Sequence, residues 1–399
     1  MSRGPSGPAR SDAGRRRGGP RALALNVLGR IEDDGAYANL ALRRALDRSA
    51  LSRRDRAMVT DLVYGVTRMR RACDWLVDRF LLRPVEPEVR RALRLGAYEL
   101  VFNGVPPHAA VGEAVELAPG RARGLVNAVL RKVAEGGCDP HELPWPDPAT
   151  RLSYPDEMVE RLVTDLGEER ALGALAVMNE PAEVTVRADG YVQDLASQWV
   201  TALVDPQRGE TVVDLCAGPG GKATGMAASG AGVVALDRRE HRARLVAANA
   251  ARVGVDLAGV VVGDGCRSPL RPGSVDRVLV DAPCTGLGVL RRRADARWRV
   301  GPDDPEELAA LQVELVASGW SLLRPGGVLV YSVCTLTAAE TVGVASALRA
   351  LAPDLEVLEP PGSPWVPWGD GAVLLPQAEG TDGMFVFVGR RHVARARLR

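Results

Sequence analysis

What the sequence lacks excludes several classes of protein. The 399-residue chain has no apolar run of about 18 residues, the length that a membrane-spanning helix needs. Its N-terminus lacks the apolar stretch of a secretory signal. Aromatic residues make up 4% of the chain, and the six cysteines lack the spacing of metal ligands or of a disulfide framework. We therefore expect no metal site, no membrane association, and free thiols in the reducing cytoplasm.

Lysine is also scarce, and the overall charge is nearly balanced. Lys132 and Lys222 are the only lysines among 51 basic residues, and the formal net charge is +1. Contact with nucleic acid therefore requires a local basic patch. Because arginine does not replace a compact ammonium, Lys222 is a candidate functional residue within its glycine-rich segment. The length predicts two or three domains, at about 100–200 residues for each domain.

The residue pattern changes along the chain and predicts domain boundaries. Residues 1–20 contain almost nothing apolar and predict a disordered basic arm, and 392–399 predict a basic tail. Apolar residues at helical spacing over 21–136 predict an all-α bundle. Residues 137–189 predict a proline-rich linker followed by a helical connector.

Residues 190–391 contain short β-branched runs that alternate with amphipathic stretches. This alternation predicts an α/β domain with a doubly wound, mostly parallel sheet. The expected strands cover 211–215, 233–237, 260–262, 277–281, 328–332 and 384–388. The expected helices cover roughly 222–229, 239–253, 305–323 and 338–351.

A glycine-rich segment, Asp214–Lys222, follows the first expected strand and predicts a ligand site. Its glycines let the backbone approach a ligand, and the next helix offers free amides at its N-terminus. Asp237 ends the second strand and suits a ribose diol, while Asp264, after the third, suits an adenine amine. With Asp281 after the fourth, this set favours S-adenosylmethionine over NAD, although any one aspartate, Asp264 especially, could instead cap a helix.

Two cysteines, Cys284 and Cys334, each follow an expected strand. Carbon 5 of cytosine is a poor nucleophile, so its methylation needs covalent catalysis. A thiolate adds to carbon 6, carbon 5 attacks a sulfonium methyl, a base removes the carbon-5 proton, and the thiol is eliminated. Cys334 precedes the helix expected near residue 338, a position that favours a thiolate. Packing is the alternative for any buried cysteine, and it is retained for Cys73, Cys138 and Cys266.

Charged residues complete the candidate site. Asp281 and Lys222 are expected to hold the polar edge of the cytosine. The basic stretch Arg291–Arg299, which contains Trp298, is the candidate RNA contact. A solvated loop with one buried tryptophan is the alternative for that stretch.

These residues resemble the RsmB/NOP family of RNA cytosine-5 methyltransferases. The resemblance is carried by the segments Asp214–Lys222, Asp281–Val289, Tyr331–Thr335 and Gly380–Gly383. It implies a class I, Rossmann-like methyltransferase domain, S-adenosylmethionine as cofactor and 16S ribosomal RNA as substrate. It also implies that Cys334 is the nucleophile and that Cys284 assists product release. The cofactor contacts that it implies are Cys216, Ala217, Gly218, Pro219, Gly220, Gly221, Lys222, Asp237, Asp264 and Asp281.

Residues 21–136 are similar to the NusB-type RNA-binding helical domain that this family carries. The matching segments are Arg94–Leu100, Val105–Val115 and Gly124–Lys132. The chain departs from the family where Gly218 replaces alanine, Thr335 replaces serine and Met384 replaces phenylalanine. It also lacks nearly all of a small RNA-contacting subdomain between Arg187 and Gly190.

The leading hypothesis is a monomeric RNA cytosine-5 methyltransferase. The alternatives are a non-catalytic NusB-like RNA-binding or antitermination factor, and a methyltransferase that acts on another RNA. An amine methyltransferase is disfavoured because Cys284 stands where such enzymes have an aromatic residue.

Overall fold

The computed structural model of the protein describes residues 19–392, which form two compact units. The first contains the residues up to Asp156 and the segment Arg293–Trp298, and the second contains Glu157–Arg292 and the residues from Arg299 onward. The arm and tail predicted at the two ends lie outside the described residues, except for Gly19, Pro20 and His392. Within residues 19–392, no helix is both long enough and apolar enough to cross a membrane.

The first unit is a helical bundle around an apolar core, as the sequence pattern predicts. Side chains such as Leu28, Leu62, Leu76, Leu93 and Leu130 are fully buried in it. Its helices are α2 (Pro20–Glu32), α3 (Ala38–Asp47), α4 (Arg53–Arg68), α5 (Arg70–Asp78), α6 (Pro87–Val101), α7 (Pro107–Leu117), α8 (Arg123–Glu135) and the short α9 (Pro148–Leu152), with a 3₁₀ turn at Gly120–Ala122.

A close contact joins α4 and α6 at Gly65. A Cβ atom added at Gly65 would lie 2.1 Å from Cζ of Tyr98. The Tyr98 ring is 7% exposed, and its hydroxyl lies 3.3 Å from Asp61 Oδ1. Because the ring is buried among other side chains, it has little room to move away, and only glycine fits beneath it.

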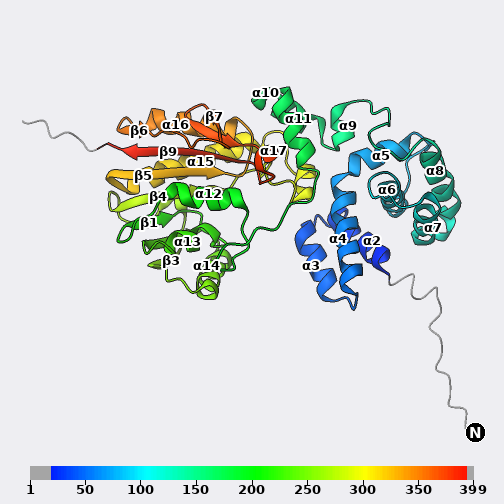
Figure 1. The fold of residues 1–399 in the computed structure, drawn as a ribbon, viewed down its shortest axis with the longest axis horizontal. Coiled ribbons are helices and arrows are strands. Elements are labelled where there is room, and N and C mark those ends of the chain that lie inside the picture. The colour runs from blue at the N-terminus through cyan, green and yellow to red at the C-terminus, as the bar shows by residue number, and fades with distance from the viewer. Residues whose placement is uncertain (1–18, 393–399) are drawn as a thin grey trace, which may run out of the picture. The chain divides into compact units, whose positions relative to one another are not determined.

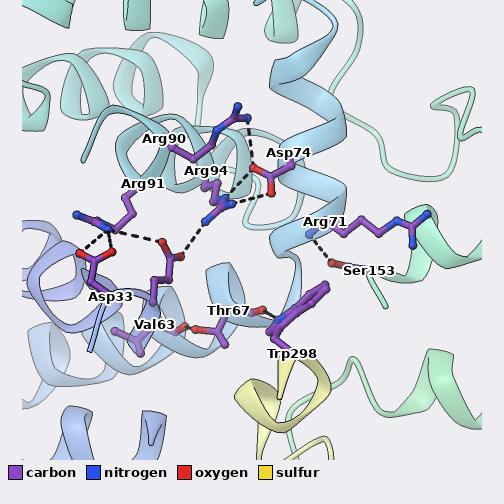
Figure 2. Close-up of polar contacts among 11 residues, drawn as sticks. Asp33, Val63, Thr67, Arg71, Asp74, Arg90, Arg91, Arg94, Ser153 and Trp298 are labelled. Atoms are coloured by element: carbon purple, nitrogen blue, oxygen red, sulfur yellow. Dashed lines mark hydrogen bonds and ion pairs between the residues drawn. The ribbon is translucent and has the colours of Figure 1, made fainter. Parts of the chain in front are cut away.

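A buried ion network joins α2, α5 and α6 (Figure 2). Arg94 donates to both carboxylate oxygens of Asp74, at 2.7 and 2.8 Å, and to Glu32 Oε1 at 2.9 Å. Arg91 lies beside it and donates to Asp33 at 2.9 Å. Because the Arg94 side chain is only 9% exposed, loss of one partner would leave a buried charge incompletely compensated.

The second segment of the first unit is a short 3₁₀ turn, η3 (Ala294–Trp298). Trp298 Nε1 donates to the carbonyl of Thr67 at 2.7 Å (Figure 2). Arg297 is fully buried, and its guanidinium donates to the carbonyl of Ser153 at 3.2 Å. This turn is therefore part of the packed interior of the helical unit.

The second unit contains a sheet of nine strands (Figure 1). The strand order is β3-β2-β1-β4-β5-β9-β8-β7, with β6 also paired to β9. The parallel strands are β1 (Thr211–Asp214), β2 (Gly232–Asp237), β3 (Gly259–Val262), β4 (Val275–Asp281) and β5 (Leu323–Val333). The antiparallel strands are β6 (Leu355–Val357), β7 (Val366–Trp368), β8 (Gly371–Leu374) and β9 (Met384–Arg391).

Helices pack on the sheet in two groups, which confirms the predicted doubly wound α/β fold. One group contacts β2 to β5 through α12 (Leu195–Val204), α13 (Gly221–Ala227) and α14 (Glu240–Val253). The other group contacts β4 and β5 through α15 (Asp304–Leu322), on which α16 (Val344–Leu351) packs. The remaining elements are α10 (Asp156–Leu166), α11 (Glu168–Val177), α17 (Pro376–Glu379), the 3₁₀ turn η2 (Gly265–Arg267) and the π-helical turn η4 (Ala339–Gly343).

The sheet contains more antiparallel pairing than the sequence predicts. All six expected strands are present, but β6, β7 and β8 were not expected. Each has only three or four residues, and Pro367 and Gly369 interrupt the pattern there. Such short segments have no periodicity that distinguishes them from loops.

The Gly65 contact leads to a stability prediction. We expect Gly65→Ala to lower the free energy of unfolding by about 1–3 kcal/mol, because the new methyl group overlaps the Tyr98 ring. Gly112→Ala is the matched control, since that glycine is exposed within α7 and an added Cβ meets nothing within 4 Å. The control is expected to raise stability by up to about 1 kcal/mol. Calorimetric melting of both variants checks this, and equal shifts would contradict the packing argument.

Candidate functional site

Two cysteine loops leave neighbouring parallel strands at the same edge of the sheet. β4 and β5 pair with Asp281 beside Ser332. Cys284 lies three residues beyond the end of β4, and Cys334 directly follows β5. Their sulfur atoms are 3.3 Å apart, and either thiol can donate to the other. The structure thus brings together the two cysteines that the sequence singles out.

The close contact changes the acidity of Cys284. Its hydrogen bond with Cys334, followed by burial, raises the pKa of the Cys284 thiol well above its usual value. Nearby Glu340 and Asp281 add to this rise in pKa. Two thiolates in contact would repel each other, so Cys284 keeps its proton when Cys334 is ionised.

A lysine–aspartate pair lies beside the thiols. Lys222 Nζ is 2.6 Å from Asp281 Oδ2, and the Ser332 hydroxyl donates to Asp281 Oδ1 at 2.8 Å. Burial lowers the pKa of Lys222, but Asp281 and, to a smaller extent, Cys334 raise it, and the net pKa is above the usual value. The amine therefore stays an ammonium, close enough to Cys334 to favour a thiolate there.

The glycine-rich segment forms the turn between β1 and α13. The amide of Ala217 donates to the Leu236 carbonyl at 2.9 Å, and the amide of Gly218 donates to Asp237 Oδ2 at 3.0 Å. Gly220 has a φ of +109°, which side chains rarely adopt. These bonds hold residues 216–221 against the end of β2, at the switch point of the sheet where α/β proteins bind ligands.

Asp214, at the end of β1, is almost completely buried beneath this turn. Its Oδ1 accepts from the amide of Cys216 at 3.3 Å. Burial, followed by repulsion from Asp281, raises the pKa of Asp214 to about 7. Burial, followed by repulsion from Asp214, Asp281 and Asp237, raises the pKa of the Cys216 thiol well above its usual value. Cys216 is therefore a protonated thiol of the loop, unlike the expected nucleophile.

The two remaining acids have local backbone partners. Asp237 is 5% exposed, and its Oδ1 accepts from the amide of Arg239 at 2.9 Å. Asp264 is exposed, lies two residues beyond β3, and accepts from the amide of Cys266 at 3.1 Å as the cap of η2. Each carboxylate oxygen can accept more than one hydrogen bond, so capping leaves acceptors for hydroxyl and amine donors. This set of acceptors fits the ribose hydroxyls and the adenine amine of a nucleoside cofactor.

A buried glutamate that sequence reasoning missed lies between the cysteine loops. Glu340 is fully buried, and its carboxylate accepts from the hydroxyls of Thr285 and Thr335, the residues that follow Cys284 and Cys334. One signal was present in the sequence, since both motifs contain the pair Cys-Thr. The pair alone does not indicate which acceptor the two hydroxyls share.

The late segment Gly380–Gly383 contacts both cysteine loops. The amide of Gly383 donates to the carbonyl of Gly288 at 2.8 Å, and the amide of Gly288 donates to the carbonyl of Cys334 at 3.0 Å. A Cβ atom at Gly288 would lie 2.2 Å from the Gly383 carbonyl oxygen. A side chain at this position would therefore separate the three backbones.

The shortened stretch near Arg187 forms a tight turn within the second unit. The amide of Gly190 donates to the Arg187 carbonyl at 2.9 Å, and the amide of Arg187 donates to the Tyr191 carbonyl at 2.9 Å. The Arg187 guanidinium donates to the carbonyl of Gly221 at 2.5 Å and to the hydroxyl of Thr224 at 3.0 Å. An arginine of this turn thus contacts the first turn of α13.

The expectation that Arg291–Arg299 forms an RNA contact is wrong for its buried arginines. Arg291 is 6% exposed and donates to the carbonyls of Pro181 and Gly380. Arg297 is fully buried, with its guanidinium carbon 4.0 Å from the centre of the Tyr154 ring. Burial lowers the pKa of Arg297 to about 10. These guanidiniums bind the protein's own carbonyls and are not available to phosphates.

Comparison with known families divides the chain in two. The family described as "16S rRNA methyltransferase RsmB/F" matches residues 201–388, and the NusB family matches residues 19–135. "Ribosomal RNA small subunit methyltransferase B" of Thermus thermophilus is 39% identical over 412 residues, covering 93% of this chain and 97% of that protein. The protein of the same name from Sodalis glossinidius is 30% identical over 425 residues, covering 92% and 96%.

Solved structures show the same fold. The protein PH0851 has a TM-score of 0.73 and 21% identity, covering 96% of this chain and all of its own. A methyltransferase homolog protein from Pyrococcus horikoshii has a TM-score of 0.53 and 24% identity, covering 61% of this chain and 98% of its own. The prediction of a Rossmann-like methyltransferase domain preceded by a helical domain is confirmed.

The buried Asp214 gives a pH-dependent prediction. Because its pKa is raised to about 7, the folded protein holds this proton more tightly than the unfolded chain does. The resulting stabilisation is complete below about pH 4 and is lost as the pH rises to about 7. In Asp214→Asn the side chain has no proton to lose in this pH range. The free energy of unfolding of the variant, minus that of the wild type, should therefore rise between pH 5 and pH 8 by on the order of 1–3 kcal/mol.

Urea unfolding of the two proteins at both pH values checks this prediction. Asp256→Asn is the control, because Asp256 is exposed on the surface of the same unit. A stability difference for Asp214→Asn that does not change with pH would contradict the argument.

Proposed function

Because the chain belongs to the RsmB/F family of small-subunit rRNA methyltransferases and carries an N-terminal NusB-family domain, we propose that it is a cytoplasmic, S-adenosylmethionine-dependent RNA cytosine-5 methyltransferase. Its product is 5-methylcytosine in 16S rRNA. The observation that carries the proposal is the pair of thiols 3.3 Å apart beside a partly buried ammonium. A methyltransferase that acts on a nitrogen or a hydroxyl has no chemical need for this pair.

The residues around the glycine-rich turn fit S-adenosylmethionine. The backbone of the turn Cys216–Gly221 would hold the cofactor, with Asp237 as acceptor for the ribose hydroxyls and Asp264 as acceptor for the adenine amine. When bound, the cofactor supplies an electrophilic methyl group on a sulfonium. The carboxylate of Asp281 lies at the end of β4, beside the switch point between β1 and β4, and favours a positively charged ligand.

Cys334 is the proposed nucleophile. Its thiolate forms a bond to carbon 6 of the cytosine, which makes carbon 5 electron-rich enough to take the methyl group. The Lys222 ammonium stabilises the thiolate before attack. The Lys222–Asp281 pair then holds the polar edge of the ring and stabilises the negative charge that develops there.

Cys284 is the proposed base for product release. Its hydrogen bond with Cys334 is the largest cause of its raised pKa. Once the Cys334 sulfur is a thioether, this cause is removed and Cys284 can lose its proton to water. The Cys284 thiolate then takes the proton from carbon 5, and the bond between carbon 6 and Cys334 breaks to regenerate the first thiolate. Because of the hydrogen bond between the two thiols, Cys284 becomes a base only after Cys334 has formed its bond to carbon 6.

The decisive experiment incubates the protein with labelled S-adenosylmethionine and 16S rRNA. Nuclease digestion and mass spectrometry should then identify 5-methylcytosine. If label enters no cytosine in either naked rRNA or isolated small subunits, the proposed function is wrong, and a non-catalytic RNA-binding role gains support.

The two cysteines should give opposite phenotypes. Cys334→Ala should lower the rate on the order of 10³-fold or more and form no covalent complex, because the nucleophile is missing. Cys284→Ala should accumulate a covalent RNA–protein complex that resists denaturing electrophoresis, because attack proceeds and release does not. Cys138→Ala, at a thiol of the helical unit, is the control and should behave as the wild type. A complex that accumulates in Cys334→Ala instead would reverse the two roles.

A further inference from the structure

The carboxylate of Glu340 binds the residue that follows each cysteine. Thr285 Oγ1 lies 2.5 Å and Thr335 Oγ1 lies 3.1 Å from Glu340 Oε2, and the two hydroxyl oxygens are 2.8 Å apart. Each hydroxyl has one proton, so two protons are shared among three close contacts: the two between the hydroxyls and Glu340 Oε2, and the one between the hydroxyls themselves. Both loops therefore meet at one carboxylate oxygen, one residue away from each thiol.

The second carboxylate oxygen binds the Cys284 loop through its backbone. The amide of Thr285 donates to Oε1 at 2.8 Å. Gln312 Nε2 donates to Oε1 at 3.1 Å and to the carbonyl of Pro283 at 2.8 Å. The residues on both sides of Cys284 are thus held, one directly by Glu340 and the other through Gln312.

Glu340 is itself held in place. It lies in the π-helical turn η4, where the Tyr331 hydroxyl, 2.6 Å away, donates to its backbone carbonyl. The Thr337 hydroxyl donates to Oε2 at 2.9 Å. The amide of Ala338, just before this turn, donates to Asp165 Oδ2 at 2.8 Å. The carboxylate therefore has a fixed position from which it can fix the two loops.

The burial of the Glu340 carboxylate indicates that this residue has a functional role. Glu340 has no solvent exposure, and the groups of residues 19–392 that donate hydrogen bonds to its carboxylate are neutral hydroxyls, one backbone amide and one side-chain amide. Burying a carboxylate this way is costly compared with an apolar side chain of the same volume. An apolar residue in η4 would avoid the cost of burying a charge, but it would bind neither of the two threonine hydroxyls. The buried carboxylate therefore serves to hold the Cys284 loop and the Cys334 loop together.

We propose that Glu340 is a positioning residue that sets the distance between the Cys284 and Cys334 thiols. The inference deepens the proposed function and rests on it for its catalytic consequence. Glu340 does not touch the reacting atoms. It acts through the two threonines, and without it the loops separate, so that the nucleophile and the base no longer reach the same ring.

The test measures the proximity of the thiols apart from activity. Diamide oxidises two neighbouring thiols to a disulfide, in which each sulfur loses one proton and one electron and diamide takes up both pairs. The rate at which the disulfide link between Cys284 and Cys334 forms is followed by peptide mass spectrometry. This link rate reports the spacing of the two thiols. We expect Glu340→Ala to slow this link about 10-fold or more and to lower kcat about 10- to 100-fold, with KM for S-adenosylmethionine little changed.

Two further variants make the result specific. Glu340→Gln keeps the shape and one acceptor oxygen, so it should fold even if the alanine variant does not, and its defects should be intermediate. Asp276→Asn is the control, because Asp276 is also a buried carboxylate of this unit, bound to the amide of Thr211 at the opposite end of β4. It should leave both the link rate and kcat unchanged.

The outcomes separate this inference from the proposed function. Slower link formation in folded Glu340 variants supports positioning even if the wild-type protein methylates no RNA. Wild-type link rates and kcat in folded Glu340→Gln and Glu340→Ala would overturn the inference. A fall in both link rate and kcat for Asp276→Asn would also overturn it, because any buried carboxylate would then have the same effect.

Discussion

The parallel pairing of β4 with β5 is the constraint on which the site depends. It sets Asp281 beside Ser332, so the two loops that carry the cysteines begin next to each other. A slip of one residue would move one loop by about 3.3 Å, the rise per residue of a strand. That shift equals the whole separation of the two sulfur atoms, 3.3 Å. Any other register of β4 and β5 would therefore disrupt the thiol contact, the Lys222–Asp281 pair and the binding of both loops by Glu340.

The parallel half of the sheet could be predicted from the sequence because its strands β1, β2 and β4 are largely buried on both faces. Runs such as those of β1, β2 and β4 consist mainly of Val, Leu and Ala, and the loops after them carry the chemistry. The positions of Cys284, Cys334, Lys222 and Asp281 follow from the rule that functional residues lie at the carboxyl ends of such strands. The strands β6 to β8 could not be predicted, because they are short and depend on partners elsewhere in the sheet: β6 and β8 pair with β9, and β7 pairs with β8.

The errors and omissions concern polar residues whose burial depends on distant partners. The arginines of the stretch 291–299 look like an RNA contact in the sequence, but carbonyls far along the chain cover two of them. Glu340 looks like a solvated residue of an amphipathic helix, but threonines from two loops cover it. Local composition predicts exposure for such residues, and only the tertiary structure supplies their partners.

The turn Arg293–Trp298 packs in the first unit although both of its flanks belong to the second. The helical unit is therefore discontinuous in the gene, because the codons for Glu157–Arg292 separate Asp156 from Arg293. A segment of that size is ordinary for an inserted domain. A single recombination event at the end of the helical region would exchange the helices without the turn that covers the Thr67 carbonyl and the Tyr154 ring. A helical region exchanged in this way would need the turn Arg293–Trp298 to be transferred with it if the Thr67 carbonyl is to keep its donor.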